Sequence, residues 1–118
     1  MKRILLTIIL AAVATVAMNA TTKTFYAYVP SYMNSLGTMT ISYNSSSVDL
    51  THQGEKMHLT VQNILTSYEG TIYLLYNKAD RTYWILAIAN SDGALFKSNS
   101  SYSVRDMKAY LSTTRLQR

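Results

Sequence analysis

Residues Thr38–Tyr43 read Thr-Met-Thr-Ile-Ser-Tyr, a strict alternation of hydroxyl-bearing and larger apolar or aromatic side chains. Successive side chains of a β-strand point to opposite faces of the sheet, so the three large side chains share one face and the three hydroxyl side chains share the other. A strand with one apolar face for the core and one polar face for solvent is typical of an antiparallel sheet. This stretch therefore predicts an antiparallel β domain.

The segments on either side repeat the pattern. Residues 24–29 form a predicted strand that ends at Pro30, which has no N–H for a central ladder. After the polar break 44–47, residues 48–61 predict a hairpin with Gly54 and Glu55 as its two-residue turn. Apolar residues then face each other in pairs on one side of the hairpin. The expected pairs are His52 with Met57, Leu50 with Leu59 and Val48 with Val61.

Residues 71–90 differ from the other segments because both of their faces are apolar. Strands of this kind need a second layer to cover the outer face. The C-terminal segment 103–115 supplies a candidate cover, since Ser103 and Asp106 have the spacing of a helix capping box. Apolar residues also recur there at helical spacing. They are Val104, Met107, Tyr110 and Leu111.

The predicted architecture is mainly β (α+β). It is an antiparallel sheet or small open barrel of about six to seven strands, with one C-terminal helix, residues 103–115, packed on it. The alternative is a two-sheet β-sandwich in which residues 71–90 lie between the sheets and the helix is peripheral.

The first residues predict export. Lys2 and Arg3 precede the largely apolar run 4–18, and Ala20 offers a small residue for cleavage. The run is shorter than the roughly 20 residues that span hydrocarbon, so a cleaved signal peptide is expected, with no stable membrane insertion afterwards. Residues 21–118 then form one small domain in the periplasm or outside the cell. The chain has no cysteine, so this domain must be stable without disulfides.

Several functional classes are disfavoured by the residues present. The chain carries a net charge of +5, but its basic residues form no stripe, so no nucleic-acid partner is expected. His52 and His58 point to opposite faces of the predicted hairpin and cannot share a metal. No nucleophile-elbow motif, paired strand carboxylates or phosphate-binding glycine loop is found. We therefore expect no enzyme activity, no metal and no cofactor.

The chain contains 10 tyrosines, a residue type that is common at recognition surfaces. Tyr26 and Tyr28 lie on the face of the first predicted strand opposite its apolar residues, and Tyr32 follows in the next loop. These three residues are the candidate binding surface for a protein or glycan partner. The expected function is a small exported binding or interaction protein, inhibitor-like or adhesion-accessory. A small barrel that binds an apolar ligand and a small hydrolase are the alternatives.

Overall fold

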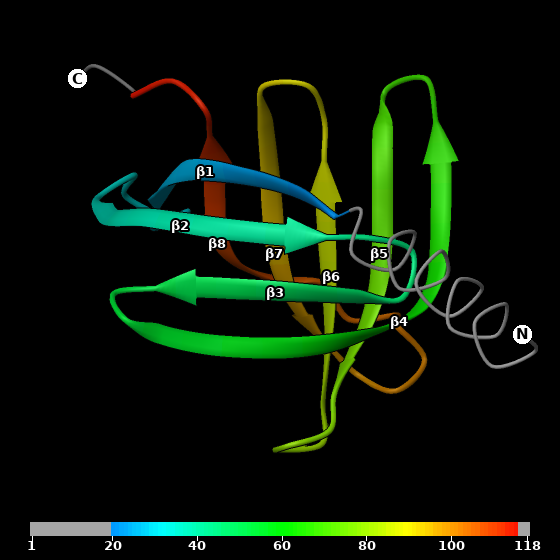
Figure 1. The fold of residues 1–118 in the computed structure, drawn as a ribbon. Coiled ribbons are helices and arrows are strands. Elements are labelled where there is room, and N and C mark those ends of the chain that lie inside the picture. Colours follow the sequence, from blue (N-terminus) through cyan, green and yellow to red (C-terminus); the bar gives the residue numbers. More distant parts are fainter. Residues whose placement is uncertain (1–19, 116–118) are drawn as a thin grey trace, which may run out of the picture.

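The protein forms a closed antiparallel barrel in which each strand pairs with the next and the last pairs with the first (Figure 1). The computed structural model describes residues 20–115, and the predicted signal peptide lies outside this range apart from Ala20. The strands are β1 (Thr21–Tyr28), β2 (Ser35–Tyr43), β3 (Ser47–His52), β4 (Glu55–Ser67), β5 (Gly70–Asn77), β6 (Thr82–Ile88), β7 (Asp92–Ser98) and β8 (Asp106–Ser112).

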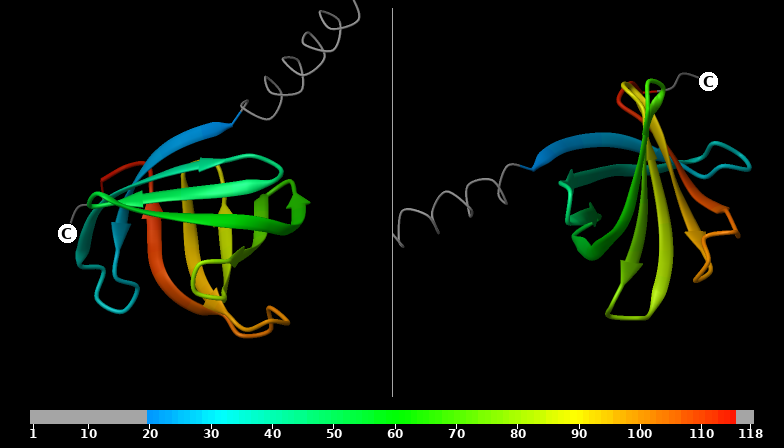
Figure 2. Two further views of the ribbon diagram at one scale, coloured as in Figure 1. Left: turned by 60° about the horizontal axis from the view of Figure 1, so that its bottom comes forward. Right: turned by 90° about the vertical axis from the view of Figure 1, so that its right-hand side faces the viewer.

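The barrel has two layers whose strands run across each other. In Figure 1, β1 to β3 run horizontally in front of β5 to β8, which run vertically, and Figure 2 shows the front layer wrapping over the rear one. The 13-residue strand β4 belongs to both layers, because its first half pairs with β3 and its second half with β5. A bulge between Val61 and Asn63 separates the halves, and bulges let strands turn such corners.

The core fills the inside of the barrel. The alternation in Thr38–Tyr43 is confirmed, since Met39 and Ile41 are buried and Tyr43 packs against the core. The inward side chains come from every strand, and eight strands leave an interior just wide enough for such filling. The largest of those that are completely buried are Phe25, Ile41, Leu59, Leu75, Leu86, Leu111 and Val48.

The predicted C-terminal helix is wrong. Residues 106–112 form strand β8, which pairs with β7 along its length and with β1 at Tyr26 to Tyr28. These two ladders close the sheet that we expected to stay open, and they raise the strand count from six or seven to eight. The predicted capping residue Ser103 lies in the preceding loop instead, where its backbone N–H donates to Asn99 Oδ1 at 3.0 Å. No helix is present in residues 20–115.

The β3–β4 hairpin is present, but its register differs from the expected one by two residues. Gln53 and Gly54 form the turn, so His52 faces Glu55 and Leu50 faces Met57. Both turn residues have positive φ, 52° and 83°, as a type I′ turn requires. Since the difference is an even number, every side chain keeps its predicted face.

Candidate functional site

The outer face of β5 to β8 is apolar, and this feature defines the main candidate site. Five residues on neighbouring strands stand directly opposite one another in the ladders and form one row across the outside of the barrel. In strand order from β4 to β8, the row is Leu65, Ile72, Ala87, Ala94 and Tyr110. The alanines make the middle of the row shallow, because a methyl group rises little above the backbone.

A second outer row runs beside the first one. It joins Leu74 on β5, Ile85 on β6, Phe96 on β7 and Met107 on β8 through direct cross-strand pairs. A bulge in the β7–β8 ladder places Met107 outward, although Leu111 on the same strand points into the core. The prediction that strands 71–90 are apolar on both faces is therefore confirmed, but no helix formed by the described residues 20–115 covers the outer face.

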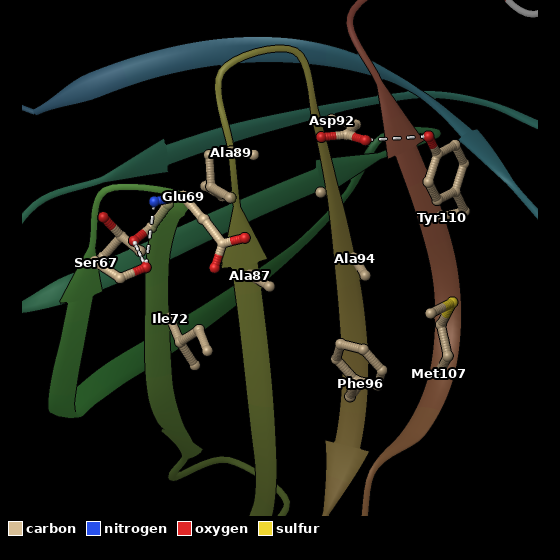
Figure 3. Close-up of a pocket in the computed structure, with 14 residues that line it drawn as sticks. Ser67, Glu69, Ile72, Ala87, Ala89, Asp92, Ala94, Phe96, Met107 and Tyr110 are labelled. Atoms are coloured by element: carbon tan, nitrogen blue, oxygen red, sulfur yellow. Dashed lines mark hydrogen bonds between the residues drawn. The ribbon is translucent and has the colours of Figure 1, made fainter.

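Part of each row lines an open groove of about 390 Å³ (Figure 3): Ile72, Ala87, Ala94 and Tyr110 from the first row, and Phe96 and Met107 from the second. Large side chains, Phe96 and Met107 among them, stand at one end of it, and the small residues Ala87 and Ala94 form its floor. The volume exceeds the roughly 300 Å³ at which ligand pockets begin. The groove can therefore accept a small apolar molecule without movement of the backbone.

A tyrosine cluster bounds the far end of the same face. Tyr76 and Tyr83 pack with their ring centroids 4.8 Å apart, and Tyr102 from the β7–β8 loop meets Tyr83 edge-on at 5.6 Å. The Tyr102 hydroxyl also donates to the Leu75 carbonyl at 3.0 Å, and burial raises the pKa of Tyr102. The loop thus covers part of the outer face and leaves the groove as the open part.

Two carboxylates lie at the opposite end of the groove. Asp92 accepts a hydrogen bond from the Tyr110 hydroxyl at 3.3 Å (Figure 3). The Glu69 backbone N–H donates to Ser67 Oγ, two residues earlier, at 3.3 Å. Burial, followed by the charge of Asp92 and this hydrogen bond, raises the pKa of Tyr110. The hydroxyl therefore stays protonated at neutral pH and donates to the carboxylate.

The candidate binding residues from the sequence are only partly brought together. Tyr26 and Tyr28 line a second groove of about 380 Å³, whereas Tyr32 is exposed and does not line it. Tyr26 is 36% exposed, but Tyr28 is only 4% exposed, so of the two candidate tyrosines on β1 only Tyr26 is open to solvent. Arg115 is the charged residue in the lining of this groove. The sequence did not predict that Arg115 lies in this groove, because Arg115 is far from β1 along the chain.

The histidines point to opposite faces of the hairpin, as predicted. His52 shares the inward face of β3 with Leu50, and its Nε2 lies 2.6 Å from the Leu36 carbonyl. His58 points outward, and its Nδ1 lies 2.6 Å from Asp49 Oδ1. Within residues 20–115, no cluster of three or more metal-ligand side chains forms.

Ser42, Asp49 and His58 are the residue types of a catalytic triad and lie in one row, but their order differs from that of a triad. In the outer row across β2, β3 and β4, Ser42 stands opposite Asp49, and Asp49 stands opposite His58. A triad places the imidazole between the hydroxyl and the carboxylate, so that the ring can take the hydroxyl proton. Here the carboxylate stands in the middle, and the row cannot activate Ser42.

Comparison of the chain with protein-family models, with curated proteins and with solved structures gave no significant match. In the part of the chain that the structure describes, no helix has the length and hydropathy needed to cross a membrane.

Proposed function

We propose that this protein is a small exported binding protein without enzymatic activity, acting in the periplasm or outside the cell. Its binding site is the outer groove of β5 to β8, and its ligand is a small molecule with a largely apolar body. One observation carries the proposal: apolar side chains from both rows line a groove on the outside of a barrel whose interior is already filled, namely Ile72, Ala87, Ala94, Phe96 and Met107. The apolar ligand therefore belongs on the outside of the barrel.

The proposal is supported by the cost of leaving such a face in water. Burial of apolar surface is worth roughly 25 cal/mol per Å², so a ligand that covers this face lowers the free energy. On the opposite half of the barrel, outward positions such as Thr40, Asp49 and His58 are polar. Only part of the outer surface is apolar, which is the distribution expected when one ligand binds on one side.

A neutral fluorescent probe tests this function. N-phenylnaphthylamine, whose emission rises in apolar surroundings, should bind the protein with one site. Ala94→Leu fills the floor of the groove and should weaken binding by at least ~10-fold, about 1.4 kcal/mol. Ala79→Leu makes the same change in the exposed β5–β6 turn and should leave binding unchanged. Equal affinity in both variants would show that the probe binds elsewhere and would refute the assignment.

The second groove supports a second candidate, the recognition of a protein or glycan by the β1 tyrosines. Tyr26 and Arg115 line it together, and an aromatic ring beside a guanidinium suits a sugar that carries a carboxylate. Binding of glucuronate oligosaccharides, measured by calorimetry, should be lost in Tyr26→Ser and kept in Tyr32→Ser. Loss in neither variant, or no binding by the native protein, would remove this candidate.

A further inference from the structure

The groove on β5 to β8 is polar at one end and apolar at the other. Glu69 lies in the β4–β5 turn and Asp92 begins β7 just after the β6–β7 turn. The ladder pairs Thr71 with Ile88 and Ile88 with Gly93, which places both turns at the same end of the sheet. Figure 3 shows Asp92 at this end, the Glu69 carboxylate extending from the same end to beside Ala87, and Phe96 and Met107 toward the other end.

The charge of the groove is opposite to that of the chain. The chain has 11 basic and 6 acidic residues, yet the charged residues that line the groove are Glu69 and Asp92, both acidic. Within residues 20–115, the ion pairs join His58 to Asp49 and Lys108 to Asp106, so neither groove carboxylate has a cationic partner in this part of the chain. A bound cation could supply the missing partner.

We propose that the ligand of this groove is a small amphiphile with an ammonium group at one end of an apolar body. The ammonium lies between Glu69 and Asp92, and the apolar body runs over Ala87 and Ala94 toward Phe96. This proposal rests on the function proposed above and adds to it the chemical class of the ligand.

The structure gives separate reasons for each part of this ligand. Each carboxylate attracts a cation and repels an anion. The Tyr110 hydroxyl donates to Asp92, which leaves the remaining lone pairs of that carboxylate free to accept from an ammonium. The apolar rows favour a hydrocarbon body through burial alone.

Three decyl amphiphiles with different heads test the proposal: decylammonium, decyl maltoside and decyl sulfate. Each is titrated by calorimetry below its critical micelle concentration, at low salt, with circular dichroism as a check on folding. We expect the ammonium compound to bind at least ~10-fold more tightly than the maltoside, and the sulfate more weakly than both. The ammonium preference should shrink as salt is added, because the carboxylates are partly exposed.

Matched variants separate the head from the body. Glu69→Gln with Asp92→Asn keeps the shape of the groove and the hydrogen bond to Tyr110. It should reduce the ratio of the ammonium affinity to the maltoside affinity to about one, while the affinity for the maltoside stays the same. Glu55→Gln with Asp80→Asn makes the same charge change at exposed positions outside the groove and should keep the preference. If the native protein binds all three compounds equally and Ala94→Leu weakens their binding, the proposed preference for a cationic head is wrong but the groove remains the binding site. No binding of any compound would overturn both.

Discussion

Strand β8 closes the barrel, and one pair of substitutions tests whether it does. A C-terminal helix with the face predicted from the sequence would bury Val104 and Leu111 together. In the barrel, Leu111 is completely buried and Val104 is 49% exposed in the loop before β8. Leu111→Ala and Val104→Ala should therefore differ strongly in their effects on stability, whereas a packed helix would make them similar.

The magnitude follows from burial. Leu111→Ala removes three carbons from the core, worth about 2.4 kcal/mol at ~0.8 kcal/mol per methylene, and the cavity left behind raises the loss to roughly 3–4 kcal/mol. Val104→Ala should stay within about 0.5 kcal/mol, as exposed substitutions do. For a domain of this size, each kcal/mol lowers the melting temperature by roughly 4–8 °C.

The assay is urea unfolding of residues 21–118 followed by tryptophan fluorescence, because Trp84 packs against the barrel core. The native protein is compared with Leu111→Ala and Val104→Ala. If the dependence of the unfolding free energy on urea concentration is the same in all three, a shift of the unfolding midpoint reports a change in stability alone. A Val104→Ala loss as large as that of Leu111→Ala would refute the strand assignment and restore a packed helix. A Leu111→Ala loss below about 1 kcal/mol would show that β8 does not close a packed core.

Three further predictions use other parts of the fold. Tyr28→Ser should lower the free energy of unfolding by about 3 kcal/mol and Tyr26→Ser by far less, measured in the same urea assay, because Tyr28 is 4% and Tyr26 36% exposed; equal losses would contradict this burial pattern. Burial raises the pKa of Tyr73, Tyr102 and Tyr110 above 10.0, so the stability linked to these groups is present below pH 10.0 and is lost as pH rises through the higher folded values. In a spectrophotometric tyrosinate titration, Asp92→Asn should lower the pKa of Tyr110 toward 10.0, and an unchanged titration curve would argue against the coupling. Protein recovered from the cell envelope or medium should begin at or near Thr21 by intact mass, whereas a species that retains residues 1–20 would contradict export with cleavage.

Local patterns in the sequence predicted much of the sheet. Alternation in Thr38–Tyr43 placed Met39 and Ile41 in the core, and the two apolar faces of residues 71–90 indicated that the outer face needs a partner. Such predictions succeed because the side-chain period of a strand is a property of the backbone. The candidate tyrosines were found by composition, but burial separates Tyr28 from Tyr26, and composition carries no information on burial.

The main groove could be predicted only in part. Its apolar strands were visible in the sequence, but its edges come from Glu69, Asp92 and Tyr110, which lie far apart in the chain and meet only through the ladders. The β8 segment misled the prediction because Met107 and Leu111 fit a helical period, while Ala109 and Leu111 fit a strand period. A segment this short satisfies both, so local spacing could not decide between them.

The sequence by itself determined that this chain forms an antiparallel β domain, with one polar and one apolar face in Thr38–Tyr43 and two apolar faces in residues 71–90, because alternation acts residue by residue. Only the tertiary structure decided that β8 pairs with both β7 and β1, that the sheet closes, and that the second apolar face remains on the outside as a groove. The physical reason is that closure depends on backbone hydrogen bonds between segments more than 80 residues apart, such as Ala27 and Leu111, and on bulges that change which side chains point inward. Backbone N–H and C=O groups are the same at every residue, so the choice among possible strand partners is made by the packing of the whole barrel.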